Sequence, residues 1–330
     1  MKMKKALALV LALVMVLALA ACAKGNTDSK GDAAGKKVGI CIYKFDDNFM
    51  TTYRNALESD LKAKGYEVSV VDGKNDQATQ TEQINTFISQ KYDVLIINPV
   101  MTSAADGIVE QVKAAGIPAV IINREPTAEV MNMWDKIAYV GCDAAQSGTY
   151  QGELILETAN KGDINGDGVI SYIMIQGDPE NIDAQLRTQY SVKALEDAGM
   201  KVEQLNLTRG DWDQAKGQEI CANDLAQFGD KVEVVFCNND AMALGAQQAI
   251  QAANRTVGKD IYLVGVDALP DALEQVKAGT MTGTVLNDAK GQAAKAIEVM
   301  EMLLKGETVE KQYYVDYVKV TPENVADFMG

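Results

Sequence analysis

A short acidic loop, DINGDGVIS, has residue types and spacing that suit a hard metal ion. Asp163, Asn165 and Asp167 stand two residues apart. Gly168 follows at the sixth place, as in the first half of an EF-hand calcium loop. A complete loop of that kind ends on a bidentate Glu at the twelfth place, where this chain has Met174. The pattern predicts a calcium site with its last carboxylate elsewhere; the alternative is a metal-free turn stabilised by side-chain to backbone bonds.

Amide and carboxylate side chains follow the ends of seven predicted strands. Ligands of open parallel sheets bind beyond the carboxyl ends of the strands, so these side chains are candidates for a binding site. Any single Asn or Asp there could instead be the N-cap of the next helix. The same chemistry at seven strand ends favours a ligand dense in hydroxyl groups, because hydroxyls donate and accept together. The residues are Asp46, Asp47, Asn48 and Phe49; Asn98; Asn123, Arg124 and Glu125; Asp178 to Arg187; Asn238, Asn239 and Asp240; Asp267; and Asn287 with Asp288.

Two aromatic residues near these strand ends, Phe49 and Trp212, could stack on the two faces of a sugar ring. A phosphate site would need a glycine-rich turn at a helix N-terminus or several basic residues. The chain has neither GxGxxG after a strand nor GxxxxGK[ST]. It also has no His, which removes the usual zinc ligand and the commonest general base.

The elements that must position these side chains are short apolar runs that alternate with longer helical patterns. Because each run is almost continuously apolar, we expect parallel strands covered on both faces. Two series of like size predict two α/β halves. The runs span residues 38–43, 67–72, 94–99, 118–123 and 137–143 in the first half, and 169–177, 201–207, 232–239, 261–268 and 282–288 in the second.

The N-terminal residues have the layout of a secretory signal, with lysines ahead of an apolar run that ends at Ala21. We expect residues 1–21 to be removed, and the LAAC sequence resembles a bacterial lipobox that would leave Cys22 lipidated; an uncleaved membrane anchor is the alternative. Residues 22–36 are small and polar, which predicts a flexible tether.

The formal net charge is −15 for the full chain, and it becomes −18 without Lys2, Lys4 and Lys5. This balance argues against nucleic acid or anionic lipid headgroups as partners. The remaining thiols, at Cys41, Cys142, Cys221 and Cys237, lack metal-site spacing. We expect them to be packed and unpaired, although an exported protein could also form disulfides.

Seven motifs, in one order from about Val38 to the end of the chain, closely resemble the galactose/glucose-binding proteins of bacterial ABC sugar uptake. They are IYKFDDNFM, INREP, DINGDGVIS, DAQLRTQY, NNDAMALGA, VGVDALPDALEQVKAG and GTVLNDA. The resemblance implies a type I periplasmic-binding fold of class α/β, with two Rossmann-like, doubly wound parallel-sheet domains joined by three crossings. The crossings would lie near residues 141–143, 286–288 and 314–317. The N-terminal lobe would comprise residues 37–141 and 288–315, and the C-terminal lobe residues 142–287 and 316–330.

The resemblance also assigns a role to each candidate residue around a bound hexose. It implies that Asp47 accepts from the 4-hydroxyl, and that Phe49 and Trp212 sandwich the pyranose. Asp183 and Arg187 would hold the anomeric end and ring oxygen. The 2- and 3-hydroxyls would be bound by Asn239 and Asp267, and the 6-hydroxyl by Asn123, with Asn287 completing the set at a crossing. Asn181 replaces a His of the family near the 6-hydroxymethyl group, which leaves xylose open as an alternative ligand.

For the acidic loop, the resemblance supplies the missing carboxylate. In the family a Glu on a separate strand completes the cage, and it corresponds to Glu233 in KVEVVFCNN. The other ligands of a structural Ca²⁺ would be Asp163, Asn165, Asp167, the Val169 carbonyl and Ser171, where the family commonly has Gln.

The resemblance implies a binding protein and not an enzyme. We expect a monomer that is lipid-anchored at the outer face of the cytoplasmic membrane. It would present a monosaccharide to an ABC permease, and a chemoreceptor is an alternative partner for the ligand-bound protein. A sugar hydrolase using Asp183 and Asp267 as an acid/base pair is a remote alternative. A sugar-responsive repressor would share the fold, but this chain begins with a lipobox where a DNA-binding headpiece would be.

Overall fold

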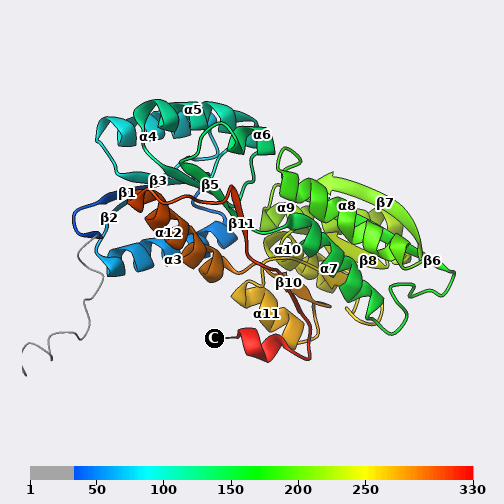
Figure 1. Ribbon diagram of the computed structural model, residues 1–330. Helices are drawn as coiled ribbons and strands as arrows, with labels where there is room; N and C mark the ends of the chain where they lie inside the picture. Colours follow the sequence, from blue (N-terminus) through cyan, green and yellow to red (C-terminus); the bar gives the residue numbers. More distant parts are fainter. Residues whose placement is uncertain (1–32, 330) are drawn as a thin grey trace, which may run out of the picture.

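Two parallel β-sheets, each covered by helices on both faces, form two lobes in the computed structural model, which describes residues 33–329 (Figure 1). The predicted signal peptide, Cys22 and most of the tether lie outside the described residues. Ala33, which was assigned to the tether, is 3% exposed and packs into the core of the first lobe. The folded part therefore begins before Lys37, because this small apolar side chain fits against the lobe. No helix within residues 33–329 is long and apolar enough to cross a membrane.

The first lobe contains a sheet in the order β11-β5-β4-β3-β1-β2, with every neighbouring pair parallel. Helices α3 and α12 cover one face and α4, α5 and α6 the other (Figure 1). The strands are β1 (Lys37–Ile42), β2 (Glu67–Asp72), β3 (Val94–Ile97), β4 (Ala119–Ile122), β5 (Ile137–Gly141) and β11 (Gln312–Tyr314). The helices are α3 (Asn48–Lys64), α4 (Gln77–Ser89), α5 (Ala105–Ala115), α6 (Ala128–Met131) and α12 (Ala289–Lys305), with a 3₁₀ turn at Thr102–Ala104.

The second lobe has a parallel sheet in the order β7-β6-β8-β9, with α7 and α8 on one face and α9, α10 and α11 on the other. The strands are β6 (Val169–Gln176), β7 (Lys201–Arg209), β8 (Val234–Cys237), β9 (Tyr262–Val264), β10 (Thr284–Leu286) and β12 (Val318–Val320). The helices are α7 (Ala144–Leu156), α8 (Ile182–Asp197), α9 (Gln214–Phe228), α10 (Asp240–Ala252) and α11 (Pro270–Lys277), with 3₁₀ turns at Gly229–Lys231 and Val325–Phe328.

Every predicted apolar run contains a strand, but β10 departs from the expected parallel ladder. It pairs antiparallel with β12. Two isolated parallel bridges also connect this segment to β9 and the residues after it: Gly283 pairs with Val264, and Leu286 pairs with Asp267. The chain passes between lobes at β5 to α7, β10 to α12 and β11 to β12 (Figure 1). The predicted α/β class, with two doubly wound lobes and a hinge of three crossings, is therefore confirmed.

Burial on both sheet faces explains why the runs of the inner strands, such as β1, β3, β4 and β8, are apolar throughout. In β1, Ile40 and Ile42 pack under α3 and α12, whereas Cys41 between them packs under α4 and α5. The sulfurs of Cys41, Cys142, Cys221 and Cys237 are buried and unpaired within the described chain, as expected. The sheets are thus fixed from both sides, and their carboxyl ends can hold side chains rigidly.

Helices α9 and α10 pack so closely that Gly245 has no room for a side chain. A Cβ built there would lie 2.0 Å from the Gln214 carbonyl oxygen. We therefore expect Gly245→Ala to lower the free energy of unfolding by about 1–3 kcal/mol, because the backbone must shift. Urea unfolding would measure it. As a control, Gly107→Ala on α5 meets no atom within 4 Å and should be neutral or raise stability by roughly 0.5–1 kcal/mol. Equal stabilities for the two variants would contradict the close packing.

Candidate functional site

A cavity lies between the two lobes, at the carboxyl ends of their strands. All ten residues proposed from the sequence as ligand contacts line it, together with three others. The lining comprises Tyr43, Asp47, Phe49, Met50, Asn123, Arg124, Asn181, Asp183, Arg187, Trp212, Asn239, Asp267 and Asn287. Residues up to 244 positions apart, the separation of Tyr43 and Asn287, therefore meet in one place.

On the first lobe, Asp47 is both a helix cap and a wall of the cavity. One carboxylate oxygen accepts from the backbone N–H of Met50 at 2.7 Å, and the other from the hydroxyl of Tyr43 at 2.6 Å. Each oxygen can accept more than one hydrogen bond, so capping leaves acceptor capacity for a ligand. Asn123 has a left-handed backbone with φ 63°, and its Oδ1 accepts from the buried amide of Asn98 at 3.2 Å.

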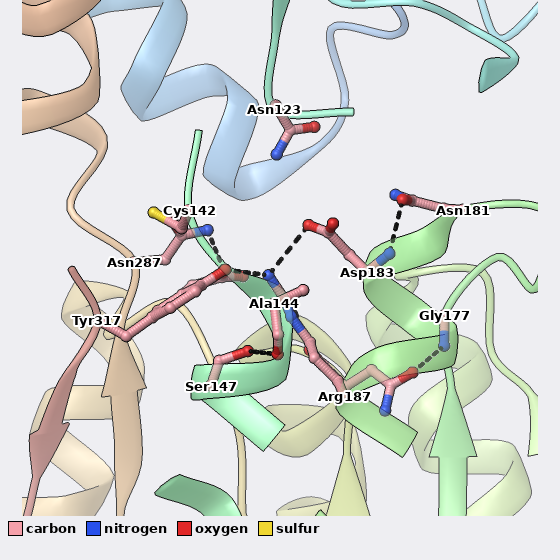
Figure 2. A network of polar contacts seen from close by, with 12 residues as sticks. Asn123, Cys142, Ala144, Ser147, Gly177, Asn181, Asp183, Arg187, Asn287 and Tyr317 are labelled. Carbon is pink, nitrogen blue, oxygen red and sulfur yellow. Dashed lines mark hydrogen bonds and ion pairs between the residues drawn. The ribbon is translucent and has the colours of Figure 1, made fainter. Parts of the chain in front are cut away.

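On the second lobe, Asn181 and Asn239 show the same double use. Asn181 caps α8 by accepting from the N–H of Asp183 at 3.0 Å (Figure 2). Asn239 caps α10 by accepting from the N–H of Met242 at 3.0 Å, and its amide donates to the Trp212 carbonyl at 3.3 Å. The capping and ligand-contact interpretations of strand-end Asn and Asp are therefore compatible, because the helix N-termini point at the cavity.

The charged centre of the cavity is Arg187, which is 3% exposed. Its Nη1 donates to the Asn238 carbonyl at 2.7 Å and its Nη2 to the Tyr317 hydroxyl at 3.0 Å. Nη2 also lies 3.6 Å from Asp183 Oδ2, one turn earlier on α8 (Figure 2). Burial raises the pKa of Asp183 to about 6, and the charge of Arg187 opposes that rise. Within residues 33–329, the Arg187 Nε has no hydrogen-bond partner.

Asp267 sits on strained backbone at the end of the second sheet. Its φ is 126° and that of Ala268 is 53°, conformations that L-residues rarely adopt. The side chain of Asn287 donates to Asp267 Oδ1 at 3.1 Å and accepts from Gln292 at 2.6 Å. Burial holds the pKa of Asp267 well above its ordinary value, although Arg187 works against this. Strain of this kind persists only where surrounding bonds enforce it.

The two aromatic walls come from different lobes. Phe49 is 7% exposed and packs edge to face on Tyr53, with ring centroids 5.9 Å apart. Trp212 lies in a turn with φ 66°. A Cβ added to Gly177 would lie 2.3 Å from the indole, so this glycine leaves the space in which the ring rests.

Sequence reasoning did not place Tyr43, Met50 and Arg124 in the site. Arg124 was recognised as a strand-end residue but was given no role. Its guanidinium lies 4.0 Å from the centroid of the Tyr43 ring and donates to the Val100 carbonyl, while its Nε lacks a partner among the described residues. An arginine directly after a buried strand was the signal that could have identified it.

Other strand-end residues do not line this cavity. Asn98 and Asn238 are fully buried, and their side chains form hydrogen bonds to neighbouring residues of the protein instead of facing the cavity. Asp240 is also buried, and it accepts from the Thr284 hydroxyl at 2.6 Å and the Leu269 N–H at 2.9 Å. Asp46, Asn48, Glu125, Asp178 and Asp288 also lie outside the lining.

The acidic loop lies before β6, and Glu233 reaches it from the start of β8. Its two oxygens accept from the N–H groups of Asn165 and Ser171, both at 2.9 Å. Asp163 and Asp167 accept from backbone N–H groups inside the loop. In the described part of the chain, no group of three or more His, Cys, Asp or Glu side chains is arranged to hold a metal.

The donor set of the loop nevertheless fits calcium chemically. Its candidate ligands are all oxygens, which hard cations prefer. Glu233 is 1% exposed and forms no ion pair with a residue of the described chain. Burying a carboxylate is costly, and a cation at the neighbouring loop would offset that cost further than the charge of Arg255 and the two N–H bonds do.

Comparisons with known proteins agree with this architecture. A family model described as "Periplasmic binding protein domain" matches residues 38–308. The D-galactose/methyl-galactoside binding periplasmic protein MglB of Haemophilus influenzae is 34% identical, over 90% of this chain and 93% of that protein. A putative rhizopine-binding protein of Rhizobium meliloti is also 34% identical, over 90% of this chain and 94% of its own.

A solved structure is similar along nearly the whole chain. It is an ABC transporter solute binding protein from Bacillus halodurans C-125 with bound myo-inositol, with a TM-score of 0.79 and 33% identity. The alignment covers 91% of this chain and 99% of that one. From the matched family model, these relatives and the two-lobed fold, the chain belongs to the periplasmic binding protein family.

Proposed function

We propose that this protein captures a monosaccharide, D-galactose or D-glucose, in the cavity between its lobes and delivers it to an ABC permease. The observation that carries the proposal is the convergence of carboxylates, amides, a buried Arg and two aromatic walls on one cavity. Such a lining satisfies hydroxyl groups in a ring plane and apolar C–H groups on its faces. The galactose name of the Haemophilus influenzae relative supports the choice of sugar.

A cyclic polyol of the inositol type is the second candidate. The solved structure with 33% identity contains myo-inositol, and Asn181 stands where the galactose/glucose-binding proteins have His. A shorter, uncharged amide changes the contact at the position of the 6-hydroxymethyl group, which inositol and xylose both lack. We propose no catalytic role for these residues, because the matched family model describes a binding protein domain.

The binding mechanism follows from the division of the site. Asp47, Phe49 and Asn123 belong to the first lobe, whereas Asp183, Arg187, Trp212, Asn239 and Asp267 belong to the second. A ligand that is bonded by both sets favours the closed arrangement and shifts the hinge equilibrium toward it. We propose that the permease reads this closed form; a chemoreceptor could read the same surface.

We further propose that the protein is exported, anchored by lipid on Cys22 at the outer face of the cytoplasmic membrane, and active as a monomer. The sequence features behind the export and anchoring proposals are the lysine-led apolar run and the LAAC sequence. A tether of small polar residues would let the lobes reach the permease while they stay attached.

We also propose a structural Ca²⁺ at the acidic loop. Asp163, Asn165, Asp167, the Val169 carbonyl, Ser171 and Glu233 would hold it. The ion would supply positive charge to a loop rich in carboxylates and fix it against the second sheet. The loop does not line the cavity, so the metal would not touch the sugar.

The ligand proposal predicts that Asp47→Ala and Trp212→Ala weaken sugar binding. Calorimetric titration with galactose, glucose, xylose and myo-inositol should show at least one ligand for the wild type. Each substitution should lower its affinity by roughly 10- to 100-fold, because a bond to a charged group or a stacking face is lost. The matched control is Asp76→Ala, which removes the same kind of cap from α4, away from the cavity. Unchanged affinity in both site variants would refute the assignment.

The raised pKa of Asp183 predicts a pH dependence of affinity. If the ionised carboxylate accepts from ligand hydroxyls, protonation below pH about 6 removes that acceptor. Affinity should therefore fall as the pH is lowered, by roughly tenfold between pH 7.5 and pH 5. Glu125 and Asp143 favour the protonated form and Arg124 the ionised one. Titrations of wild type and Asp183→Asn would test this: equal pH profiles would show that Asp183 does not act as a charged acceptor.

The calcium proposal predicts that a chelator lowers the midpoint of thermal unfolding and that added Ca²⁺ restores it. An ion that binds only the folded state stabilises it by mass action. Glu233→Gln should abolish the response. Glu219→Gln is the control, because Glu219 is an exposed carboxylate on α9 and is not one of the proposed ligands. No effect of chelation on the wild type would mean that the loop is a metal-free turn.

A further inference from the structure

Tyr317 connects the cavity to a segment that runs between the lobes. It lies between β11, in the first sheet, and β12, in the second lobe. Its side chain is 3% exposed, and its hydroxyl accepts from Arg187 Nη2 at 3.0 Å (Figure 2). Tyr317 does not line the cavity, so it can affect a ligand there through Arg187.

The other anchors of the Arg187 guanidinium belong to the body of the second lobe. The Asn238 carbonyl follows β8, and Asp183 lies one turn away on the same helix as Arg187. The Asp183 pair therefore turns with Arg187 when α8 moves. A planar guanidinium gains a defined orientation when several of its nitrogens are held. Tyr317, on a crossing between the lobes, accepts one of the hydrogen bonds that fix the guanidinium.

Tyr317 is itself held in place by contacts that do not involve Arg187. Its ring packs in the cluster that includes Cys142, on another crossing, and Leu154 of α7. Its backbone N–H donates to Gln146 Oε1 at 2.8 Å. Burial keeps the pKa of the Tyr317 hydroxyl well above its ordinary value, although Arg187 opposes this, so the hydroxyl stays neutral at physiological pH. A neutral acceptor orients Arg187 without cancelling its charge.

We propose that Tyr317 is a positioning residue of the ligand site, whose hydroxyl holds Arg187 in the orientation that meets the ligand. The crossing at residues 315–317 thereby becomes part of the binding site. This inference rests on the proposed function, since the ligand is the sugar or cyclic polyol named above. It extends that function by joining a ligand-contacting charge to a hinge segment.

Tyr317→Phe tests the proposal because it keeps the ring and removes only the hydroxyl. Titration with the compound that the wild type binds best should show a loss of affinity of roughly tenfold or more. The matched control is Tyr262→Phe. Tyr262 is buried in the same packed cluster, and its hydroxyl donates to Asn160 at 2.7 Å, away from the cavity. Wild-type affinity in Tyr317→Phe, or equal losses in both variants, would overturn the proposal.

A ligand-free measurement separates this inference from the proposed function. Nitrogen-15 NMR of the Arg187 side chain, assigned by its loss in Arg187→Lys, should show restricted guanidinium rotation in wild type and Tyr262→Phe. Rotation should be faster in Tyr317→Phe. A wild type that binds none of the four compounds would refute the proposed function, and this comparison would still decide the role of Tyr317. Unchanged rotation in Tyr317→Phe would overturn it.

Discussion

Burial of one guanidinium among carboxylates is the constraint on which the cavity depends. Removing Arg187, Asp183 and Asp267 from water costs free energy that pairing only partly returns. The structure meets this cost with fixed partners: the Asn238 carbonyl, the Tyr317 hydroxyl and the Asn287 amide. Those partners lie on strand ends and crossings, so the whole second lobe must be folded before the charges can be held. All three charged residues line the cavity, and the Arg187 Nε has no hydrogen-bond partner within residues 33–329.

Helix N-termini supply the second layer of this electrostatic arrangement. Asp47, Asn181 and Asn239 cap α3, α8 and α10, and each also lines the cavity. The positive ends of these helices are therefore directed at a space that contains carboxylates, which they stabilise. Capping also restricts each side chain to one orientation. A ligand meets groups whose conformational entropy was lost during folding, and binding is stronger for that reason.

Much of the fold follows from residue pattern because both faces of each sheet are buried. The apolar runs located the strands, and the Asn and Asp residues at their ends placed the candidate contacts in one cavity. The strands β11 and β12 were not predicted, since each spans only three residues, which is too short for a burial pattern to be recognised in the sequence. The role of Tyr317 was not predicted for another reason. It contacts Arg187, which is 130 residues away in the sequence, and no local sequence pattern encodes a contact at that separation. The strain at Asp267 is likewise set by the bonds around it.

The path of the chain through the crossings has a consequence for biosynthesis. The first sheet is completed by β11 at residues 312–314, and one of its faces is covered by α12 at residues 289–305. Both segments are made after nearly all of the second lobe. A ribosome therefore releases the first lobe's strands long before their last partners exist, and neither lobe can close its core until synthesis is almost finished. Each lobe therefore exposes apolar core surface for most of the chain's synthesis, which favours aggregation unless that surface is covered.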